Sequence, residues 1–531
     1  MTHLRPARLL TVLLASASLF VAPASAAPPE DLEARAEALI DRFEAPGLSI
    51  AIVEDGEVTF ADGFGVTDLQ DPAAVGPDTN FAIGSVTKAF TATALAILVD
   101  EGRIGWDQKV VDIMPEFRMK DAWVTREMTV RDLLVHRSGL GLGAGDLLFV
   151  PRSDLTRADV VEQLGEIPLE TSFRSSYAYD NILYMVAGRL IERVTGESWE
   201  SFVTRRILLP AGMTSATVEN DSRGPDDLMA DGHARIDGPI RGLGTMERLD
   251  DSLVVAQVAA PAGGIAASAK DMAKWIELQL ALGDLPGDAR LFSEEQGREM
   301  WNPVVLMPTP MYAGELAETA PLFNTYALGW NVRDYRGERV IMHGGGVYGS
   351  ITRLVLLPDR NVGFFLATNS EESGLLTGLQ FELLDHYLGV EGNDWPAAFG
   401  KFIDDYFANA ASQMAGPGKE PADVGPSLPL AGYAGEYADP WFGTIAVSEE
   451  KGGLTVRFPH WEGVTARLEH YQYDTFITRY EDESFEPAYV IFALDAQGKV
   501  DRVTMKAVSP VADFSWDYDD LLFKPVASNG Q

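Results

Sequence analysis

The chain has 531 residues, of which 46% are hydrophobic and 23% are charged. These proportions are those of a soluble globular protein, and they exclude a mostly disordered chain and a multi-span membrane protein. The formal net charge of −37 repels nucleic acid, and the lack of cysteine excludes disulfides, thiol catalysis and cysteine-ligated zinc.

A targeting segment is predicted at residues 1–26. Arg5 and Arg8 precede an apolar run at residues 9–21, which is shorter than a membrane-spanning helix needs. Residues 24–26 (Ala-Ser-Ala) follow as a small-residue cleavage site. We expect export, periplasmic or secreted, with cleavage after this site and no stable membrane insertion afterwards. An uncleaved amino-terminal anchor is the alternative.

A large domain is predicted at residues 27–395. Asp55-Gly56 between two apolar runs is a strong hairpin signal, so the domain should open with a helix and two antiparallel strands. Strands at both ends of a helical middle indicate an α+β fold whose sheet is completed by both ends of the chain. The expected helices are at 32–43, 87–100, 183–194 and 271–282, and the expected strands at 48–53, 58–64, 326–332, 338–342, 351–357 and 362–368.

The C-terminal part of the chain has a different pattern. Residues 396–429 are predicted to form a helix and a linker rich in Pro and Gly. Residues 430–531 contain short alternating runs separated by turns, which is typical of an all-β barrel or sandwich. The expected strands are at 443–447, 454–458, 466–469, 474–480, 489–494 and 500–507.

Ser85-Val86-Thr87-Lys88 stands at the start of a predicted helix. Residues three apart share a helix face, so the Lys88 amine can reach the Ser85 hydroxyl and activate it as a nucleophile. Helix capping by Ser85 is the alternative, but the residue three places on would then be Glu or Gln. A cation at the positive end of the helix dipole is unfavourable, which pushes the amine toward the neutral form that a base requires.

Two further segments carry candidate site residues. Tyr179 and Asn181 precede a predicted helix; a phenol whose pKa is lowered by nearby cations can move protons, and an amide can hold a substrate carbonyl or the Lys88 amine. His343 is followed by three glycines, which allow the close backbone approach that an oxyanion hole needs. The alternatives are a structural tyrosine and a glycine-rich turn with one satisfied histidine.

The other motifs are weaker evidence of function. A second Ser-x-x-Lys match at residues 448–451 lies in a predicted turn and is interpreted as chance. Residues 136–140 and 261–264 are interpreted as tight turns. No nucleophile elbow, P-loop or His-Glu-x-x-His motif occurs, and the few histidines are scattered, so we expect neither metal nor cofactor.

Three motifs follow one another along the chain: Ser-x-x-Lys at 85–88, Tyr-x-Asn at 179–181 and His-x-Gly at 343–345. In this order they resemble the motifs of the serine β-lactamase and penicillin-binding-protein superfamily. The resemblance is greatest to the branch with class C-type β-lactamases, D-aminopeptidases, D-Ala-D-Ala carboxypeptidases and lactamase-fold esterases, and it covers about residues 35–390. Residues 430–531 resemble the lipocalin-like domain often appended in this branch. Supporting matches are Phe81-Ala82-Ile83-Gly84, His136-Arg137-Ser138-Gly139-Leu140, Ala262-Gly263-Gly264-Ile265 and Leu328-Gly329-Trp330.

The resemblance implies a role for each matching residue. Ser85 would be the acylated nucleophile, and Lys88 would help to deprotonate it. Tyr179 would pass protons to the leaving group and activate the deacylating water. The other implied roles are orientation of the substrate carbonyl or Lys88 by Asn181, an oxyanion hole from the backbone N–H groups of Ser85 and Gly346, and a match of His343-Gly344-Gly345 to the Lys-Thr-Gly motif of true β-lactamases.

Two departures from the family pattern bear on substrate choice. His343 and Gly344 stand where Lys and Thr suit a substrate carboxylate, and a largely neutral His is a poorer anchor. This favours esters, amides or peptides over efficient β-lactam hydrolysis. Asp180 replaces the usual Ser or Ala, where it either pairs with a substrate amine or faces solvent.

The sequence therefore predicts an exported serine hydrolase that forms an acyl-enzyme with a small-molecule or peptide substrate. The expected substrate is a small amide or peptide (D-residue or amino-terminal) or a carboxylic ester. A cell-wall D-Ala-D-Ala carboxypeptidase and a weak β-lactamase are alternatives, as is a non-catalytic ligand- or peptidoglycan-binding protein of the same fold. The oligomeric state is left open, with a homo-oligomer among the options.

Overall fold

The computed structural model describes residues 27–218, 228–249, 255–287, 289–415, 420–461 and 463–526. The predicted targeting segment at residues 1–26 lies outside these described residues. Within them, no helix has both the length and the apolar character needed to cross a membrane.

An eight-stranded antiparallel sheet organises the first part of the chain, in the order β2-β1-β14-β13-β12-β11-β10-β9. The pairing of β1 with β14 joins the two ends of this part, and Ile52 lies opposite Phe364. The predicted α+β fold class is confirmed. The strands are β1 Gly47–Glu54, β2 Glu57–Gly65, β9 Val305–Leu306, β10 Asn324–Tyr326, β11 Asn331–Tyr335, β12 Glu338–Val347, β13 Ser350–Leu357 and β14 Val362–Thr368.

Two of the predicted strands differ from the observed ones. The single strand expected at 326–332 is divided by a tight turn, in which the N–H of Ala327 bonds to the carbonyl of Trp330 and Gly329 has a φ of 78°. The strand expected at 338–342 continues as β12 to Val347, because the three glycines pair with β13 in regular register. The glycine-rich segment is therefore part of the sheet.

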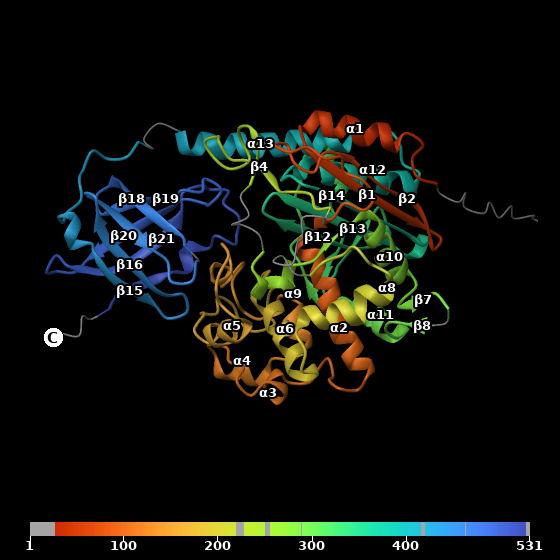
Figure 1. Cartoon of the computed structure of the whole chain (residues 1–531), viewed down its shortest axis with the longest axis horizontal. Helices are drawn as coiled ribbons and strands as arrows, with labels where there is room; N and C mark the ends of the chain where they lie inside the picture. The colour runs from red at the N-terminus through yellow and green to blue at the C-terminus, as the bar shows by residue number, and fades with distance from the viewer. Residues whose placement is uncertain are drawn as a thin grey trace, which may run out of the picture.

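Helices cover both faces of the sheet (Figure 1). One face packs against α1 Leu32–Phe43, α12 Ser373–Leu388 and α13 Trp395–Ala415 through a core of buried apolar residues. The other face packs against α10 Ala269–Leu280 and a helical lobe around α2 Thr87–Asp100. Because both faces are covered, β1 and β14 are buried along their whole lengths.

The helical lobe surrounds α2, which is buried from Thr87 to Leu98. A helix buried on all sides is a rigid support for residues at its start. The remaining helices are α3 Val110–Ile113, α4 Ala122–Glu127, α5 Arg157–Leu164, α6 Ile182–Thr195, α7 Trp199–Val203, α8 Leu209–Ala211, α9 Ala260–Gly263 and α11 Glu294–Met300. The short strand pairs are β3 Phe81–Ala82 with β6 Ala266–Ala267, β4 His233–Arg235 with β5 Met246–Arg248, and β7 Asp284–Leu285 with β8 Ala289–Arg290.

The C-terminal strands form a closed antiparallel barrel. Its interior is filled by apolar and aromatic side chains such as Tyr437, Phe476 and Phe492. The predicted all-β domain is confirmed, although the sequence did not indicate the first and last strands, which pair to close the barrel. The strands are β15 Gly435–Asp439, β16 Gly443–Glu450, β17 Gly453–Arg457, β18 Thr465–Gln472, β19 Thr475–Arg479, β20 Ala488–Leu494, β21 Val500–Ala507 and β22 Leu522–Pro525.

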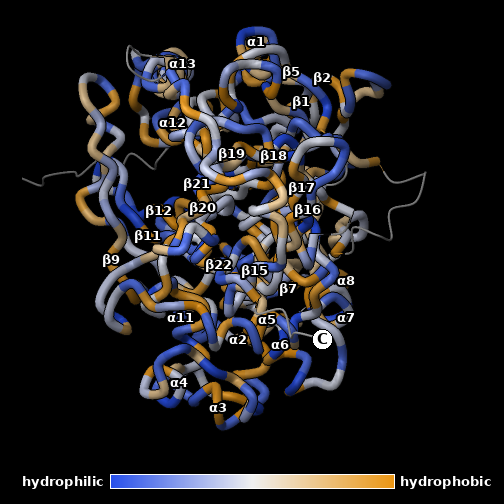
Figure 2. The backbone as a smooth tube through the Cα atoms, turned by 90° about the vertical axis from the view of Figure 1, so that its left-hand side faces the viewer, coloured by the Kyte–Doolittle hydropathy of each residue, from blue (hydrophilic) through white to orange (hydrophobic). Residues whose placement is uncertain are grey.

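The barrel packs directly on the catalytic part. Figure 2 views the molecule from the barrel side, with β15–β22 in front of the sheet and helices. The indole N–H of Trp461 bonds to the carbonyl of Leu147 over 2.9 Å, and Arg241 donates to the carbonyl of Ser484 over 2.9 Å. The two parts are thus joined by specific polar contacts as well as by packing.

Candidate active site

Ser85 lies in a single 3-10 turn, Gly84–Val86, that leads directly into α2. Its Oγ is 2.9 Å from Nζ of Lys88 and 2.8 Å from the phenol oxygen of Tyr179. The start of α2 has no side-chain cap, so Ser85 is not the helix cap that the sequence left as an alternative. The structure thus brings together the hydroxyl, the amine and the phenol that the sequence singled out.

The environment of Lys88 favours a neutral amine. Its side chain is fully buried, and burial lowers the pKa of Lys88 to about 7, against the opposing charges of Asp146 and Asp180. Nζ bonds to Oδ1 of Asn181 over 2.7 Å and to the carbonyl of Ala262 over 3.0 Å. An amine held in this way can take up a proton at neutral pH.

Tyr179 is held as a neutral phenol. Burial raises the pKa of Tyr179 well above its ordinary value. This is the opposite of the condition stated from the sequence, in which nearby cations lower it. The Lys88 amine lies over the ring, 4.8 Å from its centroid, but desolvation is the largest effect on the pKa of Tyr179. A phenol that keeps its proton can donate it to a leaving group.

His343 lies in β12 with its ring turned toward Tyr326. Nε2 is 2.7 Å from the Tyr326 hydroxyl, and Nδ1 is 2.6 Å from the carbonyl of Gly344, so the ring is fixed as the Nδ1–H tautomer. Burial, reinforced by the charge of Lys88, lowers the pKa of His343 to about 3. The side chain is therefore neutral and cannot act as a cationic anchor.

The glycines after His343 bring β12 close to the turn that carries Ser85. A Cβ atom at Gly345 would lie 2.0 Å from the carbonyl oxygen of Ile83 and 2.3 Å from Oγ1 of Thr352. A Cβ atom at Gly84, where φ is 51°, would lie 2.7 Å from the backbone nitrogen of Gly346. Glycine is required at positions 84 and 345 because the two backbones are in contact there.

Two segments interpreted as turns belong to this site. The segment at 261–264 supplies the carbonyl of Ala262 to Lys88. His136 has a φ of 56° and its buried ring packs on that of Tyr179, with the centroids 4.2 Å apart. The site uses only a carbonyl and a ring face of these segments. Both segments match the family pattern, but the matches do not indicate which of their groups take part. The turn interpretation is thus incomplete.

Two buried carboxyl groups, Asp146 and Asp180, lie near Lys88, and the sequence did not predict this pair. Asp180 is fully buried and hydrogen-bonded to Ser138, so it does not face solvent. Asp146 is fully buried and bonds to the amide of Asn181 over 2.8 Å. Burial raises the pKa of Asp146 to about 8 and that of Asp180 to about 7. No motif in the sequence points to Asp146.

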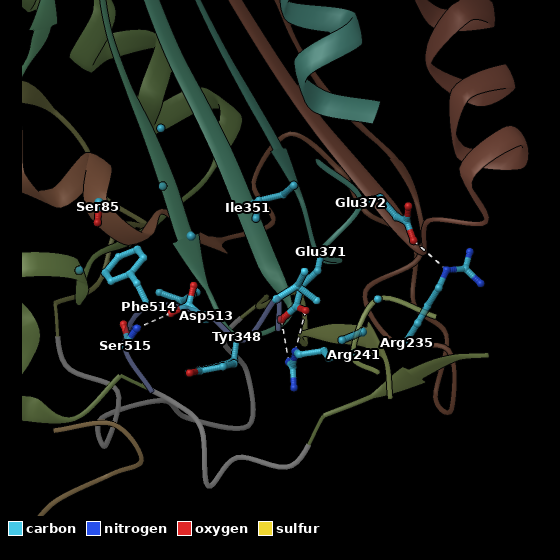
Figure 3. Close-up of a pocket in the computed structure, with 18 of the residues that line it drawn as sticks. Ser85, Arg235, Arg241, Tyr348, Ile351, Glu371, Glu372, Asp513, Phe514 and Ser515 are labelled. Carbon is cyan, nitrogen blue, oxygen red and sulfur yellow. Dashed lines mark hydrogen bonds and ion pairs between the residues drawn. The ribbon is translucent and has the colours of Figure 1, made fainter. Parts of the chain in front are cut away.

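A cavity of about 1010 Å³ opens beside Ser85. Figure 3 shows Phe514 and Ser515 of the barrel part near Ser85, with the Arg241–Glu371 ion pair farther along and the Arg235–Glu372 pair at the end away from Ser85. The lining therefore comes from the sheet, the helical lobe and the C-terminal part together. Besides Ser85, the lining includes Tyr177, Tyr179, Asn181, His343, Gly345, Gly346, Phe149 and Phe514.

The fold and this site define a β-lactamase-like serine hydrolase. The Beta-lactamase family model matches residues 33–385, and the chain belongs to that family. A second model, described as a domain of unknown function (DUF3471), matches residues 419–525 and coincides with the closed barrel, which fits a lipocalin-like domain.

Two curated relatives illustrate the family. Unguisins hydrolase ungD of Aspergillus violaceofuscus is 28% identical over 447 residues, which is 78% of this chain and 76% of the relative. Penicillin-binding protein 4 of Amycolatopsis lactamdurans is 28% identical over 362 residues, covering 67% of this chain and 89% of the relative.

Two solved structures show the same fold. The octameric penicillin-binding protein homologue from Pyrococcus abyssi superposes with a TM-score of 0.57 at 21% identity, covering 90% of this chain and 97% of the other. D-amino acid amidase from Ochrobactrum anthropi SV3, complexed with L-phenylalanine amide, gives a TM-score of 0.54 at 23% identity, covering 68% of this chain and 98% of the other.

Proposed function

We propose that the protein hydrolyses a small peptide or amide through an acyl-enzyme on Ser85. The observation that carries the proposal is the cluster in which Lys88 and Tyr179 both lie within 2.9 Å of Ser85 Oγ. An amine with a pKa of about 7 can take the hydroxyl proton, and the phenol can donate one.

The proposed reaction follows from these positions. Lys88 takes the proton as Ser85 Oγ bonds to the substrate carbonyl carbon, and the resulting oxyanion is held by the backbone N–H groups of Ser85 and Gly346. Collapse of this intermediate breaks the bond to the leaving amine, which receives a proton from Tyr179 as the phenol is reprotonated from Lys88. Water then attacks the acyl-enzyme by the same route in reverse and releases the acid.

The neutral state of His343 favours peptides and amides over β-lactams. A β-lactam or a D-Ala-D-Ala terminus carries a carboxylate, and a ring with both nitrogens already bonded supplies neither a charge nor a free donor to hold it. The fold shared with a D-amino acid amidase supports the choice of an amide. Carboxylic esters remain a second substrate class because the same nucleophile attacks them.

A probe experiment separates an enzyme from a binding protein. Purified residues 27–531 are treated with a fluorescent fluorophosphonate, with Ser85→Ala as the control, and then assayed with D- and L-amino acid p-nitroanilides, p-nitrophenyl esters and nitrocefin. Labelling at Ser85 with turnover of an anilide supports the proposal. Turnover of nitrocefin alone favours a β-lactamase. Stable acylation without turnover favours a binding protein, and a labelled Ser85→Ala variant contradicts the assigned nucleophile.

Export is proposed from the first 26 residues, which have the charge, apolar run and small-residue site of a signal peptide. Expression of the full chain in a Gram-negative host, followed by fractionation and mass measurement, tests this. A periplasmic product that begins at Ala27 supports export, and a cytoplasmic product that keeps Met1 contradicts it.

A further inference from the structure

We propose that the barrel completes the catalytic centre, with Ser515 as a positioning residue that acts on Lys88 through Asp146 and Asn181. This inference rests on the proposed function, since it concerns the same reacting hydroxyl. The segment involved is residues 508–517, which leads from β21 toward β22 and is called the barrel loop below.

A chain of four hydrogen bonds runs from the barrel loop to the nucleophile. The Ser515 hydroxyl donates to Oδ2 of Asp146 over 2.8 Å, and the same oxygen accepts from Nδ2 of Asn181 over 2.8 Å. Oδ1 of Asn181 is 2.7 Å from Nζ of Lys88, which is 2.9 Å from Oγ of Ser85. Ser515 therefore lies three side chains away from the reacting atom.

The chain sets the orientation of the Asn181 amide. An amide presents an acceptor at one end and donors at the other, and a half-turn about its last bond exchanges the two. Oδ2 of Asp146 accepts from the NH₂ end of Asn181, which turns the amide oxygen toward Lys88. With the amide reversed, an NH₂ group would face the amine that must take up a proton.

Asp146 is held in place largely by the barrel. Its Oδ1 has no hydrogen-bond partner and its side chain is fully buried, so Ser515 and Asn181 provide its hydrogen bonds in the described structure. The adjacent carbonyl of Leu147 accepts from the barrel residue Trp461 over 2.9 Å. Two successive residues of the catalytic part are thus fixed by the C-terminal part.

The barrel loop is in close contact with the backbone of the catalytic part at Gly143. Gly143 has a φ of 72°, and a Cβ atom there would lie 2.6 Å from the carbonyl oxygen of Phe514. The N–H of Gly143 bonds to the carbonyl of Tyr179 over 2.8 Å, and the ring of Phe514 contacts the ring of Tyr179 directly, with the centroids 5.8 Å apart. The Asp513 carboxylate accepts the N–H of Ser515 over 3.0 Å and shapes the turn.

Charge transmits the effect of Ser515 to Lys88. The groups that act on the Asp146 carboxyl are Lys88, Asp513 and its hydrogen-bond donors. A hydrogen bond to a carboxylate stabilises its charged form, so loss of the Ser515 hydroxyl raises the pKa of Asp146 further. Because burial already raises the pKa of Asp146 to about 8, only a small fraction of this carboxyl is charged where Lys88 titrates. Loss of the Ser515 bond reduces that fraction, so the pKa of Lys88 falls slightly. The groups that face Lys88 otherwise stay the same: Asp180 is its second carboxyl neighbour, and His136 and His343 are neutral through burial.

The test measures the rate of Ser85 phosphonylation by a fluorophosphonate between pH 5 and 9 in residues 27–531. For Ser515→Ala we expect a plateau rate about 3- to 10-fold lower, the size of one buried hydrogen bond, and an acidic limb moved slightly to lower pH. Ser515→Thr keeps the hydroxyl and should restore both.

Ser509→Ala is the matched control, because Ser509 is buried in the same loop and its hydroxyl accepts from the N–H of Val511. It should behave as the wild type. A Ser515→Ala profile that matches the wild type overturns this inference alone, as does an equal loss in Ser509→Ala. A wild-type chain that is not labelled at Ser85 overturns the proposed function, and the inference with it.

Discussion

The hydroxyl of Tyr326 lies 2.7 Å from Nε2 of His343. Together with the Gly344 carbonyl at Nδ1, this contact occupies both nitrogens of the ring. The histidine thus fixes the tyrosine and its own strand rather than facing a substrate with a free donor. His343 thus stands at the lysine position of the family motif but does not supply the positive charge of a lysine.

Replacing His343 should leave the pH dependence near neutrality unchanged. The pKa of His343 is about 3, so the ring is neutral throughout the range in which Lys88 titrates. In His343→Gln the acidic limb of kcat/KM should therefore stay near pH 7, although the plateau falls through looser packing. The profile is measured with a p-nitrophenyl ester. Disappearance of the limb would assign the titration to His343.

Loss of the Lys88 amine should remove most of the activity. Lys88→Met takes away the proposed general base, which is worth roughly 10²- to 10⁴-fold, or about 3 kcal/mol or more of transition-state stabilisation. In the wild type the rate should fall below pH 7, because protonation of the amine, whose pKa is about 7, blocks proton uptake from Ser85. The measurement is kcat/KM against pH.

Lys451→Met is the matched control for that substitution. Lys451 belongs to the second Ser-x-x-Lys match, where the Ser448 hydroxyl bonds to Glu450 on the exposed barrel surface. The same side-chain change there should leave kcat/KM at the wild-type value. A Lys88→Met variant with near-normal turnover would refute the base role.

The reacting cluster could be predicted because its members are close in sequence or in recognisable motifs. Helical spacing alone places Lys88 beside Ser85, and Tyr179 and Asn181 stand two residues apart ahead of α6. Asp146 and Ser515 could not be predicted in this way. They are separated by 369 residues, and only the docking of the barrel on the catalytic part brings them together.

In the fold, too, local sequence signals predict some elements, and others depend on contacts between distant parts of the chain. The hairpin of β1 and β2 follows from a local turn signal, and periodicity gives α2 and α6. The split between β10 and β11 depends on the left-handed backbone of Gly329, which packs against the carbonyl of Lys88. The first and last barrel strands are short, and they are defined as strands by pairing with each other across the closure.

Two adjacent glycines of β12 should respond differently to an added methyl group. Gly345→Ala places a Cβ atom 2.0 Å from the Ile83 carbonyl, so the strand and the turn that carries Ser85 must separate. Overpacking of this kind costs about 1–3 kcal/mol, and we expect a lower Tm and slower labelling of Ser85. Gly346→Ala meets only Ile351, at 4.0 Å, and should keep the wild-type Tm. Equal Tm values for the two variants would contradict the close contact.

A buried ion pair in the helical lobe should contribute strongly to stability. Arg157 of α5 bonds to Glu200 of α7 and Glu192 of α6, and Glu200 is 4% exposed. Glu200→Gln leaves the guanidinium with one carboxylate, so we expect a loss of about 2 kcal/mol or more, below the 3–5 kcal/mol of a fully unpaired buried charge. Glu294→Gln breaks the exposed Arg298–Glu294 pair and should cost about 0.5 kcal/mol or less. Urea unfolding measures both, and equal costs would show that burial of the Arg157 network does not govern its contribution.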